Sequence, residues 1–168
     1  MNRLILMRHA KTEPWSESAD DHARALTDRG VADAGLIGLE LKRRSWMVDQ
    51  ALVSTARRAR ETWRVLGDIW PRASMVLEDD LYLAGPETLS EVLRRHGTGG
   101  TVLLVAHNPG LHEAACDIAR ASGAEGTPVF RKLVEKFPTG CAAFFEVSQK
   151  GPDTVYALED VLHPLELR

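Results

Sequence analysis

Four short apolar runs constrain the fold of this chain most, because polar residues and then a segment with helical periodicity follow each of them. Such runs are typical of strands that are buried on both faces of a parallel sheet. Strands that alternate with amphipathic helices predict repeated β-α-β units and a fold of the α/β class. The predicted strands are residues 4–7, 51–53, 75–77 and 101–106.

The segments between these runs predict four helices. Thr27 is suited to cap the first helix, and Pro86 is a favourable first-turn residue for the third. The apolar face of the first helix is expected to include Val31, Ala34, Ile37 and Leu41. The predicted helices are residues 28–44, 59–70, 86–95 and 111–121.

The end of the chain has a different pattern. Residues 142–147 and 154–158 have strand character without a helix between them, which predicts an antiparallel hairpin at the edge of an otherwise parallel sheet. Residues 14–24 are polar and acidic and predict a loop. The expected architecture is a three-layer α/β sandwich with a mostly parallel central sheet and helices on both faces. The 168 residues are expected to form a single domain, 1–168.

Composition and charge exclude several classes of protein. The 21 Lys and Arg against 24 Asp and Glu give a net charge of −3, which argues against a nucleic-acid binder. No apolar run has membrane-spanning length, and the first residues lack a secretory signal, so we expect no membrane partner and a cytoplasmic protein. Cys116 and Cys141 are expected to be reduced core thiols. No metal-ligand spacing is present, which predicts no metal site.

Polar residues follow each predicted strand at its carboxyl end, where ligands bind in open parallel sheets. Arg8 and His9 follow the first strand, Arg58 lies shortly after the second, and His107 follows the fourth, whereas the acidic run 78–80 follows the third. Guanidinium groups match the oxygens of a phosphoryl group, and a neutral imidazole can attack phosphorus. The sequence therefore predicts a phosphoryl-transfer site at this rim.

Each of these features also has a purely structural interpretation. A histidine after a strand can be a satisfied structural residue, and an acidic run can be a plain loop. An arginine-rich helix start can be a solvated face. Helix geometry separates the two adjacent arginines, because Arg57 falls opposite the apolar face and Arg58 at its margin. We therefore expect Arg57 to be solvated and Arg58 to reach the rim of the sheet, with Arg60 and Arg64 nearer the exposed side.

Taken together, the motifs resemble those of the histidine phosphatase superfamily. Arg8-His9-Ala10 is similar to its strand-plus-RHG signature, with alanine where glycine is commonest. Residues 54–62 resemble its motif S-x-x-x-R-A-x-x-T, and residues 105–110 its second histidine motif. The small size, the RHA variant and two further segments make the chain most similar to the SixA-type phosphohistidine phosphatases. These two segments are residues 81–84 and 137–140.

The resemblance implies a phosphoglycerate mutase-like fold and a phosphoenzyme mechanism that needs no metal and no cofactor. His9 would be the nucleophile, Arg8 and Arg58 would bind the phosphate oxygens, and His107 would complete the phosphate-binding pocket. Larger family members place a general acid after the third strand, which makes Glu78, Asp79 and Asp80 the candidates here. A phosphohistidine phosphatase could also work without an acid, because a protonated imidazole is already a good leaving group.

The implied substrate is phosphohistidine on a protein, for which a histidine-containing phosphotransfer domain is one candidate. The first alternative is a phosphatase for a small phosphate ester. The segments after Ser54 and Asp80 leave little room for an insertion that would cap a small substrate, which favours the protein. A phosphoglycerate mutase is less favoured, because no further substrate-binding elements are found. A catalytically silent phosphate-binding module is also less favoured, because a binder has no need of the nucleophile His9.

Overall fold

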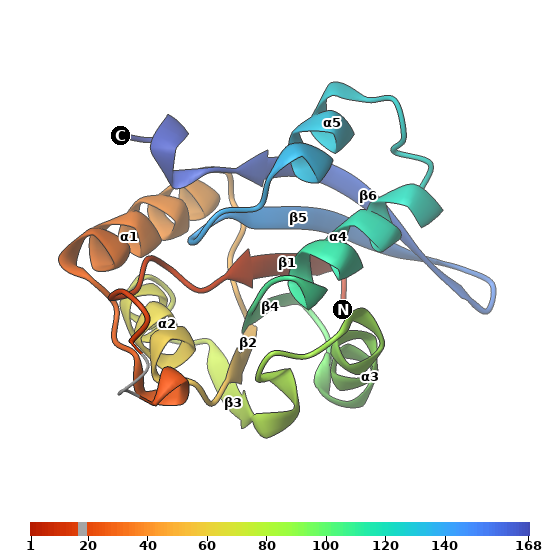
Figure 1. Cartoon of the computed structure of the whole chain (residues 1–168). Helices are drawn as coiled ribbons and strands as arrows, with labels where there is room; N and C mark the ends of the chain where they lie inside the picture. Colours follow the sequence, from red (N-terminus) through yellow and green to blue (C-terminus); the bar gives the residue numbers. More distant parts are fainter. Residues whose placement is uncertain (17–19) are drawn as a thin grey trace.

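A six-stranded sheet forms the centre of the molecule in the computed structural model, which describes residues 1–16 and 20–168 (Figure 1). The strand order is β3-β2-β4-β1-β5-β6, in which the first four strands are parallel and the last two are antiparallel. The strands are β1 (Arg3–Arg8), β2 (Gln50–Ser54), β3 (Ser74–Glu78), β4 (Thr101–Ala106), β5 (Ala142–Lys150) and β6 (Asp153–Leu162).

Helices cover both faces of this sheet and give the three-layer α/β sandwich (Figure 1). Helices α1 and α2 pack on one face, and α3, α4 and α5 pack on the other. The helices are α1 (Asp28–Arg43), α2 (Arg57–Ile69), α3 (Pro86–His96), α4 (Gly110–Ala121) and α5 (Pro128–Glu135). Three short 3-10 helices are also present: η1 (Asp21–Ala23), η2 (Asp79–Leu81) and η3 (Pro164–Glu166). No helix among the described residues is long and apolar enough to cross a membrane.

The alternation of side chains along the central strands explains their continuous apolar runs. On β1, Leu4 and Leu6 belong to the core under α3, α4 and α5, whereas Ile5 and Met7 belong to the core under α1 and α2. All six residues of β4 are buried. A strand with helices on both faces therefore has apolar residues at nearly every position, and on β4 only the first residue, Thr101, is polar.

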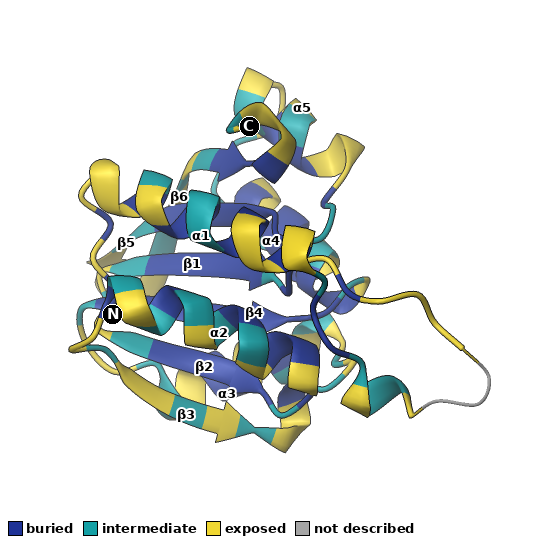
Figure 2. Ribbon diagram, turned by 90° about the vertical axis from the view of Figure 1, so that its left-hand side faces the viewer, coloured by how far each residue is buried: buried dark blue, intermediate teal, exposed yellow. Residues whose placement is uncertain are grey.

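The edge strand β3 is different, because its outer side is open to solvent (Figure 2). Met75 and Leu77 lie on β3, and each is 44% exposed. Only Val76, between them, packs against a core. The apolar run at residues 75–77 thus predicts a strand correctly, but this strand lies at the edge of the sheet and not at its centre.

All the predicted strands and helices are present, and the terminal hairpin is antiparallel as expected. Thr27 caps α1, because its side chain accepts a hydrogen bond from the Gly30 N–H. The predicted loop at residues 14–24 contains η1, and its residues 17–19 lie outside the described part of the chain. One expectation fails and one helix is missed. Val31 is 46% exposed, because it lies at the margin of the helix face that buries Ala34, Ile37 and Leu41. Helix α5 is not among the predicted helices.

Two glycines allow helix starts to approach the segments that lead into the rim of the sheet. A Cβ atom on Gly30 would lie 2.1 Å from the carbonyl oxygen of Lys11, in the segment after β1. A Cβ atom on Gly110 would lie 1.9 Å from the carbonyl oxygen of Ala84, in the segment after η2. Neither contact leaves room for a side chain, so α1 and α4 sit against these segments only because both residues are glycine.

Candidate active site

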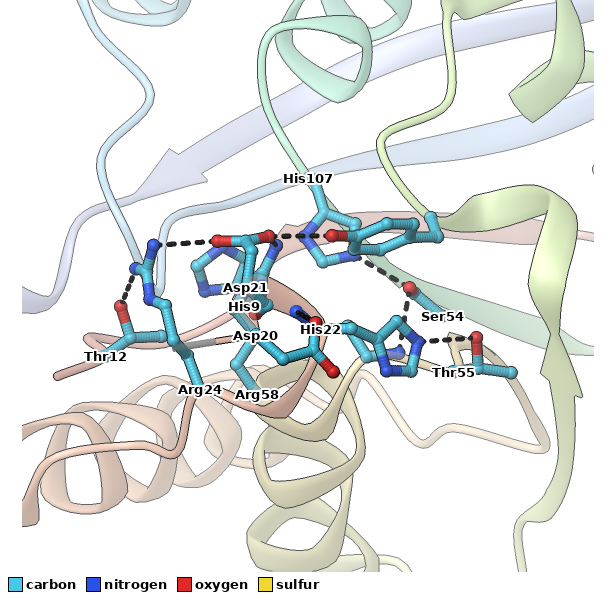
Figure 3. Close-up of polar contacts among 12 residues, drawn as sticks. His9, Thr12, Asp20, Asp21, His22, Arg24, Ser54, Thr55, Arg58 and His107 are labelled. Carbon is cyan, nitrogen blue, oxygen red and sulfur yellow. Dashed lines mark hydrogen bonds and ion pairs between the residues drawn. The ribbon is translucent and has the colours of Figure 1, made fainter. Parts of the chain in front are cut away.

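The carboxyl ends of β1, β2 and β4 bring the four predicted site residues Arg8, His9, Arg58 and His107 to one pocket. Figure 3 shows that the side chains of His9, Arg58 and His107 converge there. The prediction that these residues meet at one rim is therefore confirmed as a matter of position. The other residues that line the pocket are Lys11, Thr12, Asp21, Arg24, Leu83, Asn108 and Thr139.

His9 is buried and carries one ring nitrogen that is suited to attack. Its Nδ1 lies 2.9 Å from the carbonyl oxygen of Ala10, and a carbonyl can only accept, so Nδ1 holds the proton. No described residue forms a hydrogen bond with Nε2, so its lone pair is available. Burial lowers the pKa of His9 to about 3, and the charges of Arg58 and Arg8 act in the same direction. The ring is therefore neutral at pH 7, which is the nucleophilic form.

His107 faces His9, with 5.1 Å between the ring centroids. Its Nε2 lies 2.7 Å from Ser54 Oγ, and its Nδ1 is buried without a hydrogen-bond partner in the described part of the chain. Burial lowers its pKa to about 3, and the neighbouring His9 and Arg58 contribute to that shift. The imidazoles of His9 and His107 are thus neutral at pH 7, so the positive charge of the pocket comes from its guanidinium groups and from Lys11.

The two adjacent arginines at the start of α2 have opposite environments. The residue Arg58 is 3% exposed, and its Nη1 and Nη2 donate to the Asp21 carbonyl oxygen and to Asp21 Oδ2 at 2.6 and 3.0 Å. Arg57 is exposed and pairs with Glu61 at 2.7 Å on the helix surface. The helical-wheel prediction that separated them is confirmed. Arg60 and Arg64 are exposed, also as predicted.

A buried threonine connects the segment after β1 to helix α2. The Ala10 N–H donates to Thr62 Oγ1 at 3.0 Å, and Thr62 Oγ1 donates to the Arg58 carbonyl oxygen at 2.7 Å. Thr62 is fully buried. The residue that follows His9 and the backbone of Arg58 are therefore held by the same hydroxyl.

Arg8 is held from the opposite side by residues 137–140. Its Nη1 donates to the Phe137 carbonyl oxygen at 3.1 Å, and Asn108 Nδ2 donates to the same oxygen at 2.8 Å. The Gly140 N–H in turn donates to the His9 carbonyl oxygen at 3.0 Å. Arg8 Nε is buried and has no hydrogen-bond partner among the described residues. Part of this guanidinium therefore remains free for an anion.

The carboxylate of the pocket belongs to Asp21, which the sequence did not indicate. Tyr82 Oη donates to Asp21 Oδ2 at 2.8 Å, and Arg24 Nη1 donates to Asp21 Oδ1 at 3.0 Å (Figure 3). Burial alone raises the pKa of Asp21, but the Tyr82 hydrogen bond and the Arg58 charge outweigh it and hold that pKa below its usual value. Asp21 is therefore ionised at pH 7. It lies on η1, in a long polar loop, where no strand end marks it.

The three carboxylates expected after the third strand lie elsewhere. Glu78 Oε1 is 2.6 Å from His96 Nε2, and Asp80 Oδ2 is 3.0 Å from Arg95 Nη2, so both pair with α3. Asp79 is exposed at the start of η2. None of the three lines the pocket. Their place in the sequence is that of the expected acid, but two of the side chains pair with a neighbouring helix and the third is exposed to solvent.

Known proteins share both the sequence pattern and the fold. Residues 4–82 match the histidine phosphatase superfamily, branch 1. An uncharacterized protein of Mycobacterium tuberculosis is 38% identical over 84% of this chain and 87% of its own length. An uncharacterized protein of Mycobacterium leprae is 32% identical over 84% of this chain and 88% of its own.

Solved structures agree with this assignment. The candidate phosphohistidine phosphatase SixA of Agrobacterium tumefaciens superposes with a TM-score of 0.82 and 27% identity over 97% of this chain and 98% of that one. The candidate SixA of Nakamurella multipartitia superposes with a TM-score of 0.81 and 27% identity over 98% of this chain and 96% of that one. A phosphoglycerate mutase of Plasmodium falciparum shares the fold, with a TM-score of 0.61 and 15% identity over 94% and 88%.

The family match and the similarity to SixA make the molecule a phosphatase of the histidine phosphatase type. Its fold is the phosphoglycerate mutase-like α/β sandwich. More narrowly, the chain belongs to the histidine phosphatase superfamily and is of the SixA type.

Proposed function

We propose that this phosphatase removes phosphoryl groups from phosphohistidine on a protein, without a metal ion and through a phosphohistidine on His9. The observation that carries the proposal is the neutral, buried His9 ring, whose Nε2 is free while Arg8 and Arg58 flank it. The proposal also rests on the similarity to the SixA of Agrobacterium tumefaciens, a candidate phosphohistidine phosphatase.

The reaction would proceed in two transfers at phosphorus. His9 Nε2 attacks, a new N–P bond forms, and the N–P bond of the substrate breaks with its electron pair going to the departing imidazole. That ring is already protonated on its other nitrogen, so it leaves as a neutral imidazole. A water molecule then attacks the phosphoryl group on His9, whose nitrogen recovers its lone pair, and the protons of the water leave with the inorganic phosphate. Arg8, Arg58 and His107 would bind the phosphoryl oxygens, and the two arginines would stabilise the charge of each transition state.

The arginines provide the argument against a metal requirement. Arg8 and Arg58 supply positive charge where a metal ion would otherwise be needed, and both side chains line the pocket. We expect turnover to survive prolonged treatment with a chelator followed by dialysis. Loss of activity that one divalent ion alone restores would contradict this part of the proposal.

Asp21 has a positioning role in this proposal. Its carboxylate and its carbonyl oxygen fix both terminal nitrogens of Arg58, which holds the guanidinium plane in one orientation. Because Asp21 is ionised, it has no proton to give to a leaving group. The placement of Glu78, Asp79 and Asp80 outside the pocket supports a reaction that uses none of them as an acid. Phosphohistidine suits such a site, because its leaving imidazole departs more easily than an alkoxide.

A comparison of two substrates tests the proposed function. The enzyme is offered a histidine-containing phosphotransfer protein phosphorylated on histidine and, separately, p-nitrophenyl phosphate. We expect kcat/KM to be at least about 100-fold higher for the phosphoprotein, because its leaving group needs no acid and its surface adds binding energy. Equal kcat/KM values for the two substrates, or a higher value for p-nitrophenyl phosphate, would favour a phosphatase for small esters instead.

A further inference from the structure

A second hollow adjoins the active pocket and has no part in the mechanism above. It has a volume of about 240 Å³ and lies between the start of α1, residues 136–139 and the C-terminal residues 163–168. Figure 1 shows the C-terminal segment with η3 lying beside α1. Lys11 and Thr139 line both this hollow and the active pocket. A single bound molecule can therefore reach both at once if it is large enough.

The hollow carries an excess of positive charge. Among the described residues that line it, Asp33 has the one side-chain carboxylate. Asp33 is buried, and Arg168 donates to it from Nε and Nη2 at distances of 2.7 to 3.0 Å. Arg29 Nε lies 3.7 Å from the same carboxylate. Asp33 thus already pairs with two arginines, so its negative charge does not neutralise the positive charges of Lys11 and Lys136. Both lysines are exposed, and neither forms an ion pair with a described residue.

The wall of the hollow also contains an unsatisfied buried group. His163 is 4% exposed, and its Nε2 has no hydrogen-bond partner in the described part of the chain. Its Nδ1 is 3.9 Å from Glu166 Oε1, which is too long for a hydrogen bond. Buried polar atoms are nearly always paired, so this ring nitrogen is a hydrogen-bonding group in a residue of the wall that no described residue uses.

We propose that this hollow binds the carboxylate of an Asp or Glu side chain on the phosphoprotein while the phosphohistidine occupies the active pocket. The proposal rests on the proposed function and specifies which protein surfaces are accepted. Lysine ammonium groups are compact charges that pair with a carboxylate without a fixed geometry. The hollow has room for one side-chain terminus, and its shared wall with the pocket sets the two bound groups next to each other.

The consequence is a second point of recognition that a small phosphate ester cannot use. A monophosphate fills the active pocket alone, whereas an acidic protein surface gains attraction to Lys136 as well. Exposed charges at the rim of an interface mainly change the association rate and its salt dependence. The expected signature is therefore a change in KM for the protein substrate without a change in kcat.

Charge reversal tests the proposal. In Lys136→Glu we expect KM for the phosphorylated phosphotransfer protein to rise about threefold to tenfold, with kcat within about twofold of wild type. Lys136→Gln should show a smaller rise. The kinetics with p-nitrophenyl phosphate should stay unchanged in both. Lys150→Glu is the matched control, since Lys150 is exposed at the end of β5 that lies away from the pocket, and it should leave both substrates unaffected.

The outcomes separate this proposal from the proposed function. If wild type turns over the phosphoprotein but Lys136→Glu leaves its KM unchanged, the hollow plays no part in docking and only this proposal is overturned. Equal losses on both substrates would overturn it too, because they would show an effect through the active pocket. If wild type hydrolyses p-nitrophenyl phosphate but not the phosphoprotein, the proposed function fails, and the docking proposal fails with it.

Discussion

The predicted site residues that follow β1, β2 and β4 meet in one pocket, whereas two of the acidic residues at the end of the edge strand β3, Glu78 and Asp80, pair with helix α3 outside it. All four strands are parallel and end at the same rim, so the direction of the strands does not explain the difference. The position of each strand in the sheet explains the difference. The first three strands are neighbours in the middle of the sheet, while β3 has a partner on one side only (Figure 2).

The same contrast appears in the charged partners of the two regions. In the pocket, the carboxylate of Asp21 comes from the loop after β1 and holds Arg58, which is 3% exposed. After β3, Asp80 pairs with Arg95 in solvent, where an ion pair contributes little. A carboxylate that sits beside a strand end in the sequence is therefore not the one that the pocket uses. The following variants test this difference between the two regions.

Replacement of His9, the proposed nucleophile, should have the largest effect. In His9→Ala we expect turnover to fall by about 10³-fold or more, because no group remains to accept the phosphoryl group. The matched variant in the other region, His96→Ala, should retain wild-type turnover within about twofold. Rapid acid-free quenching and mass measurement should detect phosphate on the wild-type protein only. A phosphorylated His9→Ala enzyme would show that another residue is the nucleophile.

The adjacent arginines should differ almost as strongly. We expect Arg58→Ala to lower kcat on p-nitrophenyl phosphate by about 10²-fold or more, because a contact to the transition state is lost. Arg57→Ala should stay within about twofold, because Arg57 pairs only with Glu61 on the helix surface. Similar losses from both changes would mean that α2 does not present Arg58 alone to the phosphoryl group.

Asp21→Asn should have an intermediate effect that distinguishes positioning from acid catalysis. The amide keeps the size of the side chain but weakens its hold on Arg58, so we expect kcat/KM to fall about tenfold. The fall should be similar for the phosphoprotein and for p-nitrophenyl phosphate, and the pH dependence should keep its shape. A loss confined to the ester, together with the disappearance of a basic limb from the pH profile, would make Asp21 a proton donor.

The pH dependence of stability should report the two buried imidazoles. Each has a pKa of about 3 in the folded protein, whereas an unfolded histidine has a pKa of about 6.5. Between about pH 6.5 and about pH 3 the two histidines bind protons in the unfolded chain but not in the folded protein. The stability that depends on their neutral form is therefore fully present above about pH 6.5 and is lost progressively as the pH falls toward about 3. We expect urea unfolding to show a drop between pH 7 and pH 5 that is about 1–2 kcal/mol smaller in His107→Gln. An equal drop in the free energy of unfolding in both proteins would show that groups other than His107 cause the pH dependence.

The smallest effects are expected after β3. Glu78→Gln, Asp79→Asn and Asp80→Asn should each leave kcat within about twofold on the phosphoprotein, because none of these side chains lines the pocket. Initial rates at saturating substrate are sufficient to check this. A loss of tenfold or more in any one variant would show that the segment moves toward the substrate and acts as the family resemblance implies.

The sequence indicated the site residues that stand directly at strand ends or on a regular helix. Arg8, His9 and His107 follow buried runs, and helix periodicity alone separates Arg57 from Arg58. Asp21 could not be found in this way, because no regular element fixes where a residue of a long polar loop comes to lie. Helix α5 was missed because it is short, although Thr127 before Pro128 is a recognisable helix start.

The hydroxyl of Thr62 determines how errors in packing reach the active site. It joins the residue after His9 to the backbone of Arg58, so a shift of α2 across the sheet tends to carry His9 and Arg58 along together. A core substitution that moves α2 should therefore change the distance between these two residues less than it changes the position of either. Valine at this position would fill the same volume and remove this coupling.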